Sequence, residues 1–476
     1  MNLTRRTFVT ASAAALASSA IPHAGRAAES GFSLFQASAL RDDLDFLVTT
    51  MIDVGVNPFV YTSRAAFDAR RATIEAGLTE PLNVFGYYLR IAPLFASLND
   101  GHLSLSIGDA FKTYRDGGGE AFPLQVDLRE TGVYASETDD PAVPAGSRIL
   151  AIDGVAMEAI EAAALTMVSG QTLALRRYFA GPNIVRSYLF YRYGVRDDYA
   201  LRILRPDGTE RTVRVAATTR AHLQELAPAS SSDAAQSADY TFARMADGRV
   251  GYINYLSCHD LDAFKTFLRT TFADIANKPI DGLVIDIRQN GGGASDLNDV
   301  LWSYVTDKPF AQFGGSSKKV SDLLKRTYGK AKYVEIYGDA AWRAKDGAIL
   351  TNREGGPAGH ETYPNRYGGP VYLLIGIGTF SSAMSCATAA KDFGLATIVG
   401  EETAEPVDSN GEVFSGVAPQ TKLAFGFPTK YFFGPKPRPA GQGVVPDVAI
   451  HTSDADIAAK RDPVLDYAIG KILKRS

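Results

Sequence analysis

The sequence is poor in the residues from which metal sites and disulfides are built. Its 476 residues include only two cysteines and six histidines. The histidines form no metal-ligand spacing, and neither a CxxC nor an HExxH pattern occurs, so no zinc site is indicated and no cofactor is expected. Cys258 and Cys386 fit either one disulfide or two buried thiols, and we favour buried thiols.

Long apolar runs and blocks of one charge are also absent. Beyond residue 30, no segment approaches the ~18 consecutive apolar residues of a spanning helix, so stable membrane insertion is not expected. The formal net charge is -4 and no basic block occurs that would neutralise a phosphate backbone, which argues against nucleic acid as a partner. With 46% hydrophobic and 21% charged residues, the composition is that of a soluble globular protein. The length predicts two or three domains, and the oligomeric state is left open.

The first residues have the pattern of an export signal. Arg5 and Arg6 precede an Ala-rich, moderately apolar stretch over residues 9–21. Small residues follow, and cleavage is expected near Ala27 or Ala28. Residues 1–28 are therefore interpreted as a twin-arginine signal peptide, which predicts a periplasmic or secreted protein. The alternative is a frayed amphipathic N-terminus.

Hydrophobic periodicity divides the rest of the chain. Apolar residues recur at helical spacing in residues 34–115, which predicts a helical N-terminal unit of about three helices. Residues 120–216 alternate as short strands, which predicts a small β-rich domain. Residues 217–238 are rich in Ala, Ser and Gln and are interpreted as a linker.

The longest patterned region, residues 239–476, alternates strands with helices. This order predicts an α/β domain with a mainly parallel sheet. A Lys-rich and Gly-rich insert over residues 309–368 has no predicted place in it. The expected strands cover residues 250–255, 282–287, 371–375 and 397–400, and the expected helices cover residues 261–275, 295–304 and 383–393.

Two turns in this region join a buried strand to a helix and can expose backbone N–H groups at the carboxyl end of the sheet. The first contains Gly291, Gly292 and Gly293, and the second runs through Thr379 and Phe380 into Ser381 and Ser382. A serine at a helix start can be a nucleophile beside an oxyanion site, although serine more often caps the helix there.

A serine nucleophile needs a neighbouring base. His102 follows an Asp-Gly turn at the start of a short strand and is the candidate. A lone histidine is more often structural, so the residue type alone does not decide between a structural and a catalytic role.

The order of these motifs resembles the tail-specific or C-terminal processing serine peptidases (S41-type). The shared features are the Asp-Gly-His turn, Asn-Gly-Gly-Gly after a strand, Thr-Phe-Ser-Ser-Ala at a strand-to-helix turn, and Gly-Val-Val-Pro-Asp near the C-terminus. The resemblance implies a ClpP/crotonase-like α/β catalytic domain within a multidomain α/β protein. It marks Ser381 as nucleophile and His102 as base, and it gives the oxyanion hole to Ser382 and one of the three glycines.

The middle domain carries a second resemblance. Residues 144–154 are similar to the core of a PDZ domain, and residues 199–215 to its closing hairpin. The insert between them, residues 173–196, is longer than that module normally has, so an unrelated β-sandwich piece is the alternative. A PDZ-like domain would bind a polypeptide substrate by strand addition and would hold its terminal carboxylate.

Departures from the family place the chain closer to its tricorn-like branch. The Ser-Lys branch has a lysine about 25 residues beyond its serine, where this chain has Pro406, and neither Glu405 nor Val407 can serve as such a base. The tricorn-like branch has a glutamate shortly before the Gly-Val-x-Pro-Asp strand, but residues 438–442 contain no acid. Met384 stands where the Ser-Lys branch usually has a glutamate, and the third catalytic residue stays unassigned.

The sequence therefore predicts an exported serine endopeptidase that cleaves unfolded or C-terminal protein segments. A catalytically inactive binding protein with the same fold, for peptides or apolar ligands, is the main alternative. A crotonase-like enzyme acting on thioesters is a second, although it would need no serine nucleophile.

The export signal can be tested directly. Replacing both Arg5 and Arg6 by lysine keeps the charge but removes the arginine pair, so the precursor should accumulate inside the cell. Cell fractionation with antibody detection measures this outcome. Undiminished export of the double variant would contradict a twin-arginine signal.

Overall fold

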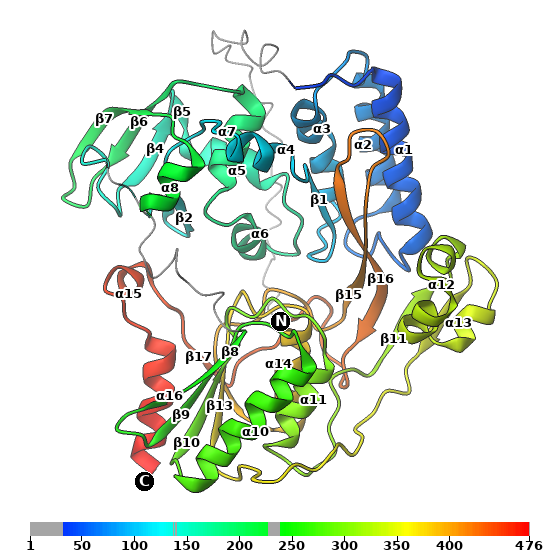
Figure 1. Cartoon of the computed structure of the whole chain (residues 1–476), viewed down its shortest axis with the longest axis vertical. Helices are drawn as coiled ribbons and strands as arrows, with labels where there is room; N and C mark the ends of the chain where they lie inside the picture. The colour runs from blue at the N-terminus through cyan, green and yellow to red at the C-terminus, as the bar shows by residue number, and fades with distance from the viewer. Residues whose placement is uncertain (1–31, 137, 139, 227–238, 476) are drawn as a thin grey trace, which may run out of the picture.

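Three units form the part of the chain that the computed structural model describes, residues 32–136, 138, 140–226 and 239–475 (Figure 1). The predicted signal peptide, residues 1–28, lies outside these residues. Within them, no helix combines the length and the apolar character needed to cross a membrane. The expected architecture, a helical unit, a β-rich unit and an α/β unit, is confirmed, although the chain is shared among the units differently than the sequence suggests.

The α/β unit is built on a six-stranded sheet with the order β17-β14-β13-β10-β9-β8. All neighbours are parallel except β8, which pairs with β9 antiparallel. Every residue of β10 and β13 is buried, as expected for central strands covered on both faces. The strands are β8 (Tyr240–Met245), β9 (Val250–Tyr255), β10 (Gly282–Asp286), β13 (Val371–Ile375), β14 (Thr397–Gly400) and β17 (Val448–Ala449).

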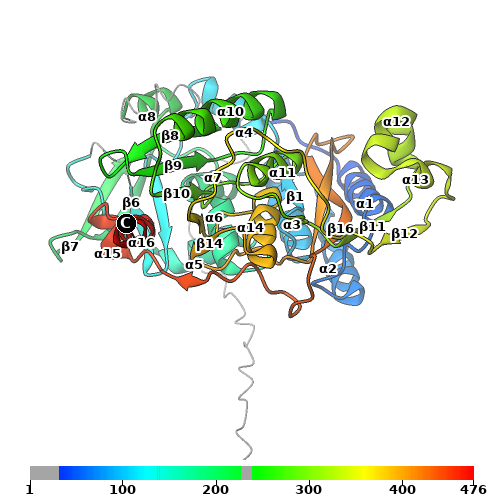
Figure 2. The same ribbon diagram turned by 90° about the horizontal axis from the view of Figure 1, so that it is seen from below.

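Helices cover both faces of this sheet (Figure 2). The helices α10 (Leu261–Asn277), α11 (Asp296–Ser303) and α14 (Ser382–Phe393) pack on one face, and α16 (Pro463–Arg475) packs on the other, preceded by α15 (Asp454–Ala458). A Cβ added at Gly282 would lie 2.5 Å from Cγ1 of Ile472, so a glycine in β10 lets α16 approach the sheet closely.

The helical unit is completed by segments from far along the chain. Its helices are α1 (Ala37–Val54), α2 (Arg64–Gly77), α3 (Val84–Ala96) and α4 (Ala110–Asp116). They share a core with an antiparallel sheet in which β1 (Ser104–Ser106) pairs with β16 (Ala424–Phe433). Strand β16 also pairs with β15 (Ser409–Val417) and β11 (Gly315–Lys319).

The structure gives the insert at residues 309–368 a place in this second sheet. The insert supplies β11, α12 (Asp322–Tyr337), α13 (Asp339–Arg343) and β12 (Ile349–Asn352). Residues 239–476 were predicted to form one domain, but they contribute to two sheets. The reason is that β15 and β16 bury Phe414, Phe425 and Phe427 against the N-terminal helices rather than against the parallel sheet, and β11 and β12 extend the sheet by pairing onward from β16.

The middle unit is an antiparallel sheet with the order β2-β3-β4-β6-β7, as the alternating pattern predicts. The long insert at residues 173–196 forms two helices, and the PDZ-like identity stays a prediction. The predicted linker, residues 217–238, includes α8 (Arg220–Leu226), and residues 227–238 are not described. The elements are β2 (Val126–Arg129), β3 (Gly132–Ala135), β4 (Arg148–Ile152), β5 (Val155–Ala156), α5 (Met157–Leu165), α6 (Leu173–Ala180), α7 (Ile184–Tyr193), β6 (Asp198–Leu204) and β7 (Glu210–Ala216).

One buried carboxylate holds the β15–β16 hairpin on the helical unit. Asp43 of α1 is fully buried, and its oxygens accept hydrogen bonds from the backbone of Gln420 and from the backbone and hydroxyl of Thr421. Asp43→Ala would leave these donors unpaired, so the free energy of unfolding should fall by on the order of 3 kcal/mol. Urea denaturation measures the change. The exposed neighbour Asp42 provides the control, and equal effects of Asp42→Ala and Asp43→Ala would contradict the role of Asp43.

Candidate active site

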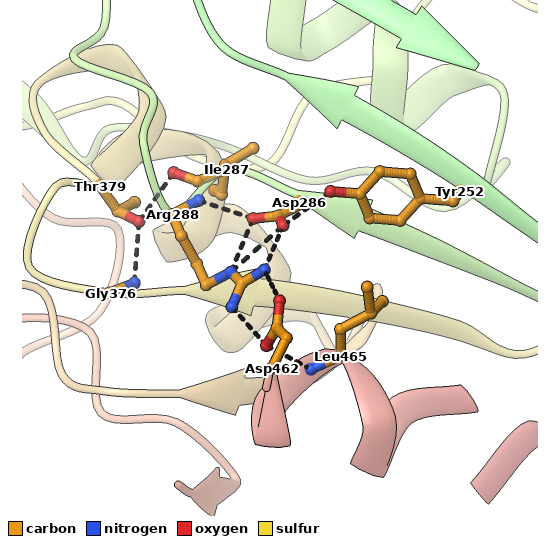
Figure 3. Close-up of polar contacts among 8 residues, drawn as sticks. All are labelled: Tyr252, Asp286, Ile287, Arg288, Gly376, Thr379, Asp462 and Leu465. Carbon is orange, nitrogen blue, oxygen red and sulfur yellow. Dashed lines mark hydrogen bonds and ion pairs between the residues drawn. The ribbon is translucent and has the colours of Figure 1, made fainter. Parts of the chain in front are cut away.

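Ser381 lies on the turn between β13 and α14 in a constrained backbone conformation. Its φ of 54° and ψ of −121° fall in a region that residues with a side chain rarely adopt. The turn is held by Thr379, whose hydroxyl donates to the carbonyl of Ile287 at 2.9 Å and accepts from the N–H of Gly376 at 3.0 Å (Figure 3). The strained serine is thus fixed to the end of the neighbouring strand β10.

The glycine turn after β10 lies directly against Ser381. A Cβ added at Gly292 would be 2.7 Å from Cβ of Ser381 and 2.9 Å from the backbone nitrogen of Ser382. Gly292 also has a φ of 98°, so this position favours glycine on two counts. Its N–H donates to the side-chain oxygen of the buried Asn290 at 2.9 Å. Of the three glycines predicted as oxyanion donors, Gly292 is therefore already engaged, and Gly291 and Gly293 remain.

His102 reaches Ser381 from the helical unit. Its Nε2 lies 3.0 Å from Oγ of Ser381, which is hydrogen-bonding distance. The imidazole packs on the ring of Phe380, with the two ring centroids 4.5 Å apart. The structure therefore brings the two predicted catalytic side chains together, although they are 279 positions apart in the chain.

Glu405 completes the arrangement on the far side of the imidazole. Its Oε1 lies 3.3 Å from Nδ1 of His102, a contact that is not aligned as a hydrogen bond. The other oxygen, Oε2, accepts the backbone N–H of Ser381, and Oε1 also accepts the hydroxyl of Ser409 at 2.8 Å. The carboxyl is 1% exposed. One side chain thus contacts both predicted catalytic residues.

Glu405 was passed over at the level of sequence. It lies 24 positions after Ser381, close to where the Ser-Lys branch has its lysine, and it was considered only as a replacement base. Its loop runs beside the segment where the tricorn-like branch has a glutamate, because the N–H of Val407 donates to the carbonyl of Gln442 at 3.0 Å. A carboxylate from the adjacent segment therefore lies against the histidine.

Burial governs the protonation of this group. It lowers the pKa of His102 to about 4, so the imidazole is neutral near pH 7 and can accept a proton. It raises the pKa of Glu405 to about 8, although the bonds from Ser381 and Ser409 oppose that shift. Because the two groups are in contact, ionised Glu405 would favour a positive charge on His102. Both pKa shifts have the same cause, because burial removes the water that would stabilise the charged form of each group.

Several segments hold the turn that carries His102. The buried carboxylate of Asp100 accepts the N–H of His102 at 2.9 Å and the side-chain amide of Asn410 at 2.7 Å. From the middle unit, the hydroxyl of Ser169 accepts the N–H of Asp100 at 3.0 Å, and Oε1 of Gln171 accepts the N–H of Gly101 at 3.2 Å. The base is therefore positioned by all three units.

A charged network anchors the start of the glycine turn (Figure 3). Arg288 follows β10 and donates to Asp286 at 2.6 Å and to Asp462, before α16, at 2.6 Å and 2.8 Å. The hydroxyl of Tyr252 donates to Asp286 at 2.9 Å. Burial works to lower the pKa of Arg288, but the hydrogen bonds that it donates to both carboxylates outweigh this effect and raise the pKa. The network borders a cavity of about 990 Å³ between β2, α6 and the carboxyl ends of β10 and β13.

Neither cysteine takes part in a disulfide. Cys258 and Cys386 are both buried and free, as favoured from the sequence. Among the described residues, no group of three or more His, Cys, Asp or Glu side chains could hold a metal ion.

Comparison with known structures supports this fold over most of the chain. A crystal structure of a mutant of CPAF superposes with a TM-score of 0.62 at 17% identity, covering 89% of this chain and 95% of that chain. Mature CPAF complexed with lactacystin gives a TM-score of 0.60 at 17% identity, covering 92% and 100%. At these identities the likeness concerns the fold alone. No curated protein matches the chain in sequence.

A family model provides the sequence-level relationship. The model of peptidase family S41 matches residues 249–450, a range that holds the glycine turn, Ser381 and Glu405. Residues 249–450, somewhat less than half of the chain, are therefore similar in sequence to peptidase family S41.

Proposed function

We propose that the protein is a serine endopeptidase in which Ser381 is the nucleophile, His102 the base and Glu405 the carboxylate that supports the base. The observation that carries this proposal is the continuous contact from Ser381 Oγ through His102 to Glu405, at 3.0 Å and 3.3 Å. A serine hydroxyl becomes nucleophilic when such a base takes its proton.

In the proposed reaction, Ser381 Oγ attacks the carbon of the scissile peptide bond while His102 Nε2 takes the hydroxyl proton. The negative charge on the carbonyl oxygen is stabilised by the N–H of Ser382 and by one N–H from Gly291 or Gly293. His102 then gives its proton to the departing amine as the C–N bond breaks. Water hydrolyses the acyl-enzyme by the same proton transfers. Ionised Glu405 stabilises the imidazolium that forms in each step.

The substrates proposed are unfolded or C-terminal polypeptide segments. The cavity of about 990 Å³ supports this because it extends from β2, an edge strand of the middle unit, to the loops that carry Gln289 and Gly378, close to the active site. An extended peptide can add to an edge strand, and the side chains of the cavity then contact it. With the signal predicted at residues 1–28, we propose that cleavage takes place in the periplasm or outside the cell.

Hydrolysis by the two central side chains can be tested by substitution. Ser381→Ala and His102→Ala should each reduce peptide hydrolysis by a factor on the order of 10³ or more, and the double variant should be hardly slower than either, because the two side chains act as a unit. The measurement is kcat/KM on an extended, C-terminally apolar peptide. His259→Ala, which changes an exposed histidine, is the control. Equal and negligible rates for the wild type and Ser381→Ala, with equal peptide binding, would favour a binding protein instead.

The role of Glu405 has a pH signature. Since its raised pKa of about 8 keeps the carboxyl protonated below that value, kcat/KM of the wild type should rise with pH through an apparent pKa near 8. Glu405→Gln keeps the shape but cannot ionise, so this rise should vanish and the rate at high pH should fall by a factor on the order of 10³. A pH–rate profile measures both effects.

Glu401→Gln is the matched control for that profile. Glu401 lies on the same loop and pairs with His451 instead of His102. Its substitution should leave the rise near pH 8 in place. The role of Glu405 would be wrong if Glu405→Gln kept the same rise.

A further inference from the structure

A second cavity, of about 650 Å³, lies on the helical unit and is lined by basic but not by acidic residues. Arg70 of α2, Arg90 of α3 and Arg176 of α6 all contribute to its wall. The cavity is separate from the one that borders the glycine turn, and its volume is within the range of about 300 to 1,000 Å³ typical of small-molecule sites.

The guanidinium groups of Arg90 and Arg176 donate only to neutral partners. Arg90 donates to the carbonyl of Gly77 at 2.7 Å, and Arg176 donates to the carbonyl of Gly170 at 3.0 Å and to the side-chain oxygen of Asn99. Among the described residues, no carboxylate lies within ion-pair distance of any of the three arginines. Other arginines of these helices are paired, as Arg64 is with Asp68.

Of the three arginines, Arg176 is the one whose charge is most disfavoured by burial. Its side chain is partly buried, and burial lowers the pKa of its guanidinium because no counter-charge offsets the lost hydration. Arginine side chains that line one cavity without a carboxylate favour an anion, because a guanidinium can donate two parallel hydrogen bonds to the oxygens of a carboxylate or phosphate. The remaining wall adds hydroxyls from Thr73 and Ser97 and apolar surface from Ile74 and Pro93.

We propose that this cavity binds a small organic anion, with its carboxylate or phosphate head on the arginines and its apolar body on Ile74 and Pro93. The proposal does not depend on the function proposed for Ser381. The site is nevertheless adjacent to the base, because Arg176 contacts Asn99, three positions before His102.

Calorimetric titration tests the proposal with three probes: N-acetyl-L-leucine, phenyl phosphate and the neutral N-acetyl-L-leucinamide. At least one of the two acids should bind the full chain, and the amide should bind about 10-fold more weakly or not at all, because charged hydrogen bonds are lost. Binding should weaken at high salt. Whichever acid binds more tightly identifies the head group.

The variants locate the site. Arg70→Gln with Arg90→Gln should reduce affinity for the binding acid about 10-fold or more, while Arg64→Gln on the same helix should not. Ser381→Ala should bind as tightly as the wild type, which separates this cavity from the active site. The proposal is overturned if neither acid binds, if the amide binds equally well, or if the arginine double variant keeps full affinity. Both exposed arginines can be replaced without removing buried packing, so the variants should fold.

Discussion

The pairing of β1 with β16 is the contact on which the candidate active site depends. It holds Ser104, two positions after His102, opposite Gly426, and so fixes the base relative to the hairpin that begins at Ser409. Glu405 lies just before that hairpin and contacts both His102 and Ser381. One short antiparallel ladder thus aligns the helical unit with the parallel sheet, and a shift of one residue would turn the alternating side chains of β1 to the wrong face.

The pairing of β1 with β16 also helps to bury the candidate site away from water. His102, Glu405 and Asp100 lie among side chains from all three units, which exclude water from three ionisable groups at once. Burial disfavours a charge that has no partner of opposite sign. It therefore raises the pKa of the carboxyl groups of Asp100 and Glu405 and lowers the pKa of His102, which favours the neutral form of each. In the proposed reaction, Glu405 must therefore lose its proton before it can stabilise the imidazolium that forms when His102 takes the serine proton.

Local patterns were sufficient for four strands of the parallel sheet, β9, β10, β13 and β14, but not for β8 and β17 at its edges. The predicted strand over residues 250–255 and the observed β9 agree, and so do residues 371–375 and β13. The second sheet escaped prediction because β1 has three residues and its partner lies more than 300 positions away. No local period can indicate such a pairing.

The residues of the candidate site also fall into two groups, those that the sequence predicts and those that only the structure shows. Ser381, His102 and the glycine turn could be predicted because each lies in a motif of a few adjacent residues. Glu405 could not, because a glutamate on an irregular loop has no pattern of its own. Its contact with His102 follows from the neighbouring course of two loops, seen only when Val407 is found bonded to Gln442. The engaged N–H of Gly292 likewise depends on the rotamer of Asn290.

The separation of the key side chains along the chain has a consequence for biosynthesis. His102 lies just before β1 of the antiparallel sheet and Ser381 follows β13 of the parallel sheet, and the strand that brings the two together, β16, is among the last to leave the ribosome. A nascent chain therefore has its histidine and its serine but no assembled proton path between them. In the peptidase proposed above, the proton path would therefore form only when the tertiary structure is complete.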